Sequence, residues 1–191
     1  VFRSTNNGTS WMQVDSGLTN HFISSLATNG TDLFAGSYYG GGGVFRSTDN
    51  GISWTQINSG LTDKYVSALV VKGANVFAGT FQGGGIFRST NNGTSWTPVN
   101  SGLTNTTICT FIVSGTNLFA GTYDGIFRST NDGTSWTQVN SGLTSDIVYS
   151  FAVSGSKIFA GTYDGGLFLS TNNGTSWTKV NFGLTCPYVK S

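Results

Sequence analysis

The chain has 191 residues, of which 28 are Gly and 9% are charged, and its formal net charge is +1. This charge excludes a basic face large enough to hold nucleic acid or anionic lipid, and no apolar run of about 18 residues is present to span a membrane. The hydrophobic fraction of 37% is large enough to form a core, so we expect a folded chain. All eight acidic residues are Asp, which competes with helical backbone hydrogen bonds, so we expect almost no helix.

The first predicted element is a strand hairpin within residues 1–17. It carries the octet Ser-Thr-Asn-Asn-Gly-Thr-Ser-Trp, and close copies of this octet follow along the chain. The five copies begin at positions 4, 47, 89, 129 and 170, so successive copies are 43, 42, 40 and 41 residues apart. A repeat of about 40–45 residues is the length of one four-stranded propeller blade. The sequence therefore predicts repeated units that each form one small sheet.

The following elements are clearest in the unit at residues 61–102. An apolar, β-branched run at residues 66–71 and an alternating run at residues 76–81 predict its first two strands. Residues 86–90 and 95–100, joined by an Asn-Gly turn, predict the third and fourth strands. Such a sheet cannot bury its apolar face alone, so the units must pack on one another, and radial packing predicts a β-propeller.

The predicted fold is an all-β propeller of four-stranded antiparallel blades, four whole and one incomplete, in a single domain. No segment has a helical apolar period over ten or more residues. The predicted unit boundaries are 1–17 for the half blade, 18–60, 61–102, 103–142 and 143–183 for the whole blades, and 184–191 for a tail.

The octet resembles the Asp-box, or BNR, repeat, whose pattern is S/T-x-D-x-G-x-x-W. That family includes sialidases, sortilin-type receptors, some xyloglucanases and photosystem assembly factors. The resemblance covers the whole chain, and it implies that each octet is the hairpin between the third and fourth strands of a blade, with the Trp packed into the blade. Asp49 alone keeps the acid at the third position. The Asn of the other copies keeps an acceptor for the turn amides but removes the charge, which favours a structural role.

We therefore predict a structural role for the third, fifth and eighth positions of each octet, although a sugar could also stack on an exposed Trp. These residues are Asn6, Gly8, Trp11, Asp49, Gly51, Trp54, Asn91, Gly93, Trp96, Asn131, Gly133, Trp136, Asn172, Gly174 and Trp177. A phenylalanine also recurs at one strand position, as burial between blades requires, and each contributes about 2 kcal/mol of transfer energy. The predicted core phenylalanines are Phe2, Phe45, Phe87, Phe127 and Phe168.

Four arginines recur one position after these phenylalanines. They are Arg3, Arg46, Arg88 and Arg128. The resemblance to sialidases raises the idea of a carboxylate clamp, because that enzyme class uses three arginines for it. A clamp needs guanidinium groups that converge on one point, whereas equivalent positions in different blades point outward by symmetry. We predict that these arginines lie on the surface or bind the edge of a neighbouring blade.

The sequence contains few residues that could act as catalytic acids, bases or nucleophiles. The chain has no Glu, and most glycosidases need a pair of carboxylates, while a sialidase needs a Tyr nucleophile with acidic partners. Asp63, Asp124, Asp146 and Asp164 all lie in repeated turns, and His21 is the single histidine, with no nucleophile in a recognisable frame. We predict no enzymatic activity and no catalytic, cofactor-binding or metal-binding residues.

Glycosylation sequons and cysteines bear on the location of the protein. A secreted chain would offer five asparagines to N-glycosylation, three of them in octet turns. They are Asn7, Asn29, Asn92, Asn105 and Asn173. Cys109 and Cys186 have no CxxC spacing, so no metal knuckle is predicted and one disulfide stays open. We expect an extracellular or cell-surface protein.

The incomplete unit is the most singular feature of the sequence. Residues 1–17 supply only third and fourth strands, and residues 184–191 match only the entry to a first strand. We expect the uncovered edge to pair with other copies of the chain or with missing blades of a longer chain. The predicted function is a non-enzymatic extracellular scaffold, with no nucleic-acid partner and no membrane insertion. The alternatives are a fragment of a sialidase-like or other glycoside hydrolase, and a carbohydrate-binding or membrane-complex assembly-factor propeller.

Overall fold

The computed structural model describes residues 1–190, and every regular element in that range is a β-strand. Eighteen strands form four four-stranded sheets and one two-stranded sheet, and neighbouring strands pair in antiparallel fashion. This architecture confirms the predicted all-β propeller with four whole blades and one incomplete blade.

Within each sheet the strands follow the order of the chain. The two-stranded sheet contains β1 (Phe2–Arg3) and β2 (Met12–Gln13). The first whole blade contains β3 (Ile23–Thr28), β4 (Leu33–Ser37), β5 (Gly43–Ser47) and β6 (Thr55–Gln56). The second contains β7 (Val66–Lys72), β8 (Asn75–Thr80), β9 (Ile86–Ser89) and β10 (Thr97–Pro98). The third contains β11 (Ile108–Ser114), β12 (Asn117–Thr122), β13 (Gly125–Ser129) and β14 (Thr137–Gln138). The fourth contains β15 (Val148–Ser154), β16 (Lys157–Thr162), β17 (Leu167–Ser170) and β18 (Thr178–Lys179).

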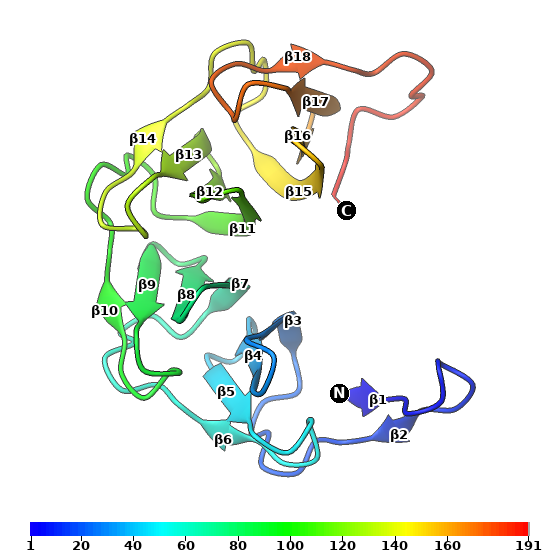
Figure 1. Ribbon diagram of the computed structural model, residues 1–191, viewed down its shortest axis with the longest axis vertical. Helices are drawn as coiled ribbons and strands as arrows, with labels where there is room; N and C mark the ends of the chain where they lie inside the picture. Colours follow the sequence, from blue (N-terminus) through cyan, green and yellow to red (C-terminus); the bar gives the residue numbers. More distant parts are fainter. Residues whose placement is uncertain (191) are drawn as a thin grey trace.

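The blades follow one another around an open arc (Figure 1). The first strand of each whole blade, β3, β7, β11 or β15, lies toward the inside of the arc, and the fourth strand lies at its outer rim. The two ends of the chain lie on opposite sides of the opening. The inner wall of the arc is therefore built from the same strand of every blade.

The core lies between the blades rather than within any one of them. Phe34 of the first blade is fully buried and packs in one cluster with Val66 and Leu69 of the second blade. Close approach depends on a glycine in the second strand, because a Cβ on Gly36 would lie 2.7 Å from a methyl carbon of Val66. Each blade thus buries its apolar face on the next, as the repeat requires.

Four of the five predicted core phenylalanines are buried. Phe45, Phe87, Phe127 and Phe168 are each at most 1% exposed. The prediction is wrong for Phe2, which is 62% exposed. Phe2 belongs to the two-stranded sheet, and within residues 1–190 no inner strand pairs with that sheet to cover its ring.

Each inner strand contains one register shift near its start. A β-bulge places an extra residue at that point and redirects its side chain. The shifts lie between Ile23 and Ser25, between Val66 and Ala68, between Ile108 and Thr110, and between Val148 and Ser150. The residues that the bulges redirect are accordingly Ser24, Ser67, Cys109 and Tyr149.

Candidate functional site

The third position of the octet organises its turn through hydrogen bonds to the backbone. In the second blade, Asn91 Oδ1 accepts hydrogen bonds from Ser89 Oγ at 2.8 Å and from the Ser95 N–H at 2.9 Å. Ser89 Oγ in turn accepts the Gly93 N–H at 2.8 Å, and Asn92 adopts a φ of +54°. Asn tolerates this left-handed conformation better than most residues. The Asn91 side chain therefore stabilises the turn with its amide oxygen.

The octet tryptophans connect consecutive blades. In the second blade the indole Nε1 of Trp96 donates to the carbonyl of Ile57 at 2.7 Å, and the Trp96 N–H donates to Ser59 at 2.9 Å. The same two bonds recur from the other whole blades to the unit before them, and these tryptophans are 3% or 4% exposed. Trp11 is different, because it is 64% exposed. The expectation that all five tryptophans are packed is thus wrong for Trp11, which within residues 1–190 has no preceding blade to bind.

The recurring arginines do not converge on one point. Arg46 forms an ion pair with Asp32 of its own blade at 2.7 Å. Arg88 and Arg128 each donate to a carbonyl in the octet turn of the next blade, Asp132 at 2.8 Å and Asn173 at 2.9 Å. Their roles are local contacts at separate blade edges, and this geometry does not form a carboxylate clamp.

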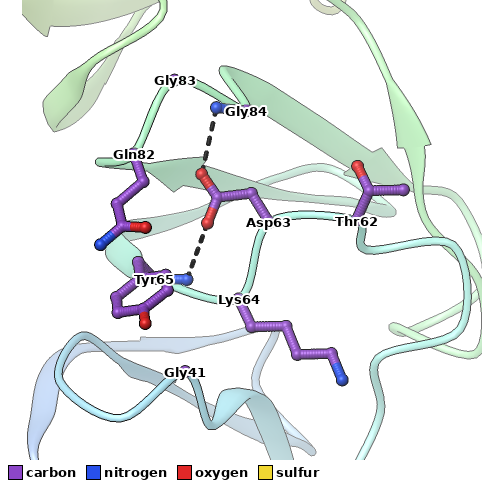
Figure 2. Close-up of a pocket in the computed structure, with 8 residues that line it drawn as sticks. All are labelled: Gly41, Thr62, Asp63, Lys64, Tyr65, Gln82, Gly83 and Gly84. Atoms are coloured by element: carbon purple, nitrogen blue, oxygen red, sulfur yellow. Dashed lines mark hydrogen bonds between the residues drawn. The ribbon is translucent and has the colours of Figure 1, made fainter.

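One pocket lies beside the loops of the first and second blades and has a volume of about 600 Å³. It is lined by Gly41, Thr62, Asp63, Lys64, Tyr65, Gln82, Gly83 and Gly84. Figure 2 shows that the Asp63 carboxylate accepts the N–H groups of Tyr65 and Gly84, both at 3.0 Å. Asp63 is the single acid lining this pocket, and it holds two loops together. The pocket has no pair of carboxylates for glycoside hydrolysis.

Aromatic side chains form a continuous row along the inner face of the arc, at the end where first strands begin and second strands end. Neighbouring rings have centroids 4.6 to 6.3 Å apart and meet edge to face, with interplanar angles of 65° to 88°. Contacts of this kind stabilise aromatic pairs. We name these residues the aromatic row: Phe22, Tyr38, Tyr39, Phe81, Tyr123, Tyr149, Tyr163 and Tyr188.

Part of the aromatic row is open to solvent. Phe22 is 65% exposed, Tyr39 63%, Tyr163 50% and Tyr188 43%. The middle of the row closes one side of a pocket of about 340 Å³. The bulge residues Ser24, Ser67, Cys109 and Tyr149 line the same pocket, together with Lys190. The bulges thus place one side chain from every whole blade beside the row.

Two phenols of the row, those of Tyr38 and Tyr149, have raised pKa values. Burial is the main cause that raises the pKa of Tyr38, followed by the nearby Tyr39. A hydrogen bond with Tyr123 is the main cause that raises the pKa of Tyr149, followed by burial. At neutral pH these two side chains are therefore uncharged rings whose hydroxyl groups can donate and accept hydrogen bonds.

The sequence alone does not identify this site. Tyr38, Phe81, Tyr123 and Tyr163 occupy equivalent positions in a repeated turn, and repetition around an arc also places equivalent side chains in line. The overlooked signal is the bulge position, which holds Ser, Ser, Cys and Tyr in turn, whereas the residue before it is always Ile or Val and the residue after it is always small. Such variation inside a regular repeat indicates a position that packing alone does not fix.

The predicted sequons and cysteines occupy unrelated places. Three sequon asparagines lie in octet turns, while Asn29 and Asn105 accept N–H groups of their own loops. Both cysteines are free, and burial raises the pKa of the Cys109 thiol to about 12. Among residues 1–190, no three His, Cys, Asp or Glu side chains are placed to hold a metal ion. In the same range no helix is long and apolar enough to cross a membrane.

Comparison with known families agrees with this geometry. Residues 70–187, more than half of the chain, match the family described as the DUF6242 beta propeller domain, and residues 45–56 match the BNR/Asp-box repeat. The chain belongs to the DUF6242 beta propeller family. No curated protein sequence is significantly similar to it.

Solved structures show the same fold at low sequence identity. An ancestral GH74 enzyme superposes with a TM-score of 0.77 and 18% identity, over 98% of this chain and 29% of that one. The GH74 xyloglucanase from Xanthomonas campestris gives 0.76 and 16%, over 94% and 34%. The extracellular domain of the one component system BT4673 from B. thetaiotaomicron gives 0.67 and 18%, over 82% and 22%. The DUF6242 chain thus spans about a third or less of each of these proteins.

Proposed function

We propose that this chain is a non-enzymatic extracellular scaffold that binds its ligand on the aromatic row. The observation that carries this proposal is the continuity of the row, which runs across all four whole blades on the inner face of the arc. Exposed aromatic side chains in line are uncommon on a surface without a partner, and Tyr in particular is enriched where proteins bind other molecules.

The surroundings of the acids favour binding over catalysis. Asp32 is paired with Arg46, Asp63 holds two backbone N–H groups, and Asp164 accepts the Ser145 hydroxyl at 2.5 Å. None of these carboxylates lines the pocket beside the row. A glycoside hydrolase needs two carboxyl groups about 5–10 Å apart across its substrate. The alternative of an enzyme fragment would therefore need a pair of carboxylates that these three acids do not supply beside the row.

The extracellular part of the proposal is supported by the comparisons. The structure from B. thetaiotaomicron is described as an extracellular domain. The octet turns also depend on Asn, Gly, Ser and Thr and not on buried thiols, which suits a protein in an oxidising environment.

One experiment tests both parts of the function. The wild-type chain and the double variant Tyr39→Ala/Tyr163→Ala are applied to a glycan array and a peptide array, and each protein is incubated with xyloglucan and with a fluorogenic sialoside. We expect a ligand class that only the wild type retains, and no release of reducing sugar or fluorophore by either protein. Turnover by the wild type, or equal binding by both proteins, would contradict the proposal.

A second surface favours association with further blades of the same kind. Phe2, Trp11 and Met12 of the two-stranded sheet are all more than 60% exposed. In the whole blades the side chain equivalent to Trp11 is buried against the preceding unit. We propose that another propeller blade, from a second copy or a longer chain, covers this surface.

A further inference from the structure

We propose that the aromatic row binds a neutral polysaccharide chain, an inference that rests on the proposed function of the row as a binding surface. Four properties favour this ligand: the chemistry of the rings, the length of the row, its charge, and the backbone groups that the neighbouring strand edges leave free.

The rings match the two kinds of surface on a sugar. Six of the seven tyrosines in the chain belong to the row, and the remaining members are two phenylalanines. A pyranose has an apolar face of C–H groups and an edge of hydroxyl groups. A tyrosine has an apolar ring face and a hydroxyl that both donates and accepts hydrogen bonds. A surface made of tyrosines can thus hold both parts of each sugar.

The length of the row fits a polymer better than a small molecule. Its contacts run from Tyr39 of the first blade through Phe81 and Tyr123 to Tyr163 of the fourth blade. Successive centroids are 4.6 to 6.3 Å apart, about the width of a single sugar ring. The pocket beside the row is lined by side chains from all four whole blades. An extended chain of sugars would contact several blades at once.

The charge of the site selects for a neutral polymer. Among the residues that line the pocket, Lys190 is the single charged side chain, and the others are Ser, Cys, Tyr and Phe. An acidic polysaccharide would gain one ion pair there and would lose the hydration of its remaining carboxylates. A neutral chain loses no charge hydration when it binds.

An extended peptide is less well matched to the same surface. Peptides that lie along a sheet usually add a strand and use free backbone groups of its edge. Here the Ser24 hydroxyl donates to the Val66 carbonyl at 2.6 Å, and the Ser67 hydroxyl donates to the Ile108 carbonyl. The bulges also break the regular spacing of the inner strands at these residues. The inner edges beside the row therefore lack the regular set of free acceptors that an added strand needs.

Affinity electrophoresis in gels that contain a soluble polysaccharide tests this inference. The probes are xyloglucan and hydroxyethylcellulose as neutral polymers and polygalacturonate as the acidic one. The proteins are the wild type, Tyr39→Ala, Tyr163→Ala, and Phe182→Ala as the matched control, because Phe182 is fully exposed and lies outside the row. Tyr39→Phe is added to separate stacking from hydrogen bonding. Thermal unfolding of each variant verifies that the exposed substitutions leave the fold intact.

We expect the wild type to be retarded by at least one neutral polymer and not by polygalacturonate. Each Tyr→Ala change should weaken binding by about 2- to 12-fold, the range for the loss of one aromatic contact, whereas Phe182→Ala should not change it and Tyr39→Phe should retain most of it. Retardation by polygalacturonate alone, or binding to a peptide array that Tyr39→Ala abolishes, would overturn the neutral polysaccharide as the ligand and keep the row as a binding surface. Absence of binding to every probe, or binding by Tyr39→Ala and Tyr163→Ala that is as strong as that of the wild type, would overturn the proposed function as well.

Discussion

Asp49 shows how the octet works at the scale of one residue. Its carboxylate accepts hydrogen bonds from the Ser47 hydroxyl at 2.7 Å and from the N–H and hydroxyl of Ser53 at 2.9 and 2.5 Å. The bonds from Ser53, followed by that from Ser47, lower the pKa of Asp49 to about 2. At Asn91 the amide makes the same contacts without the charge, and its nitrogen donates to Ser95. Acid and amide are therefore interchangeable in the turn at neutral pH.

The variant Asp49→Asn tests this equivalence through its pH dependence. Because the pKa of Asp49 is lower in the folded chain than its ordinary value of 3.8, its contribution to stability is full above about pH 4 and is lost as the pH falls through about 2. We expect Asp49→Asn to match the wild type at pH 7 and to lose less stability between pH 4 and pH 2. Urea midpoints at several pH values measure the difference. A large loss at pH 7 would show that the charge itself is needed.

The site was harder to predict than the turns because the placement of the bulge residues depends on the tertiary structure. The octet could be read from the sequence because its Asn, Gly and Trp each serve a local geometry that recurs unchanged. Ser24 and Tyr149 occupy one equivalent position, but their approach to the aromatic row depends on a register shift and on the curvature of the arc. Neither property leaves a pattern in the order of residues along one strand.

At the scale of the element, the junction between blades depends on a glycine beside the octet tryptophan of each whole blade. Gly102 has a φ of +86°, and a Cβ built there would collide with the carbonyl oxygen of Trp136. Gly183 is its equivalent after the fourth blade and has a φ of +84°, with no atom within 4 Å of such a Cβ. The two glycines share their conformation and differ only in the neighbouring blade.

This pair allows a matched measurement of the cost of that contact. Left-handed strain of about 1–2 kcal/mol affects Gly102→Ala and Gly183→Ala equally, whereas only Gly102→Ala also forces a shift of the next blade. We expect Gly102→Ala to lose about 1–3 kcal/mol more free energy of unfolding than Gly183→Ala, the usual cost of overpacking. Urea denaturation monitored by circular dichroism at low protein concentration measures the free energy of unfolding of both variants. Equal losses would mean that the junction adapts without cost.

The strand order and the repeat length could be predicted from the sequence because the same residues recur in every unit. Each blade makes its contacts with the next blade through residues that recur, so one unit such as residues 61–102 contains the information for all. Exposure of Phe2 and Trp11 could not be read in this way, because burial belongs to the neighbouring unit and not to the octet itself. The sequence of one unit thus specifies the fold of its blade, whereas the neighbouring blade decides which of its side chains are buried.

At the scale of the whole molecule, the two end faces of the arc are complementary. One face presents Trp11, whose counterparts in the whole blades donate to the preceding unit through both N–H groups. The other face presents Gly183, which has room for a carbonyl, and Leu184, which is 49% exposed although its counterpart Leu61 is 3% exposed. Each face therefore carries one half of the junction that joins neighbouring blades.

We therefore expect the 191-residue chain to associate head to tail as its concentration rises, because a heterologous contact of this kind can repeat from copy to copy. Light scattering after size exclusion should show a mass that grows with protein concentration. Gly183→Ala should abolish this growth, since its Cβ would occupy the place of the Trp11 carbonyl, and Trp11→Ala should weaken it. Thr185→Ala, which leaves both halves of the junction intact, is the control. A monomeric mass throughout the micromolar range, or growth that Gly183→Ala leaves unchanged, would show that the two faces do not bind each other.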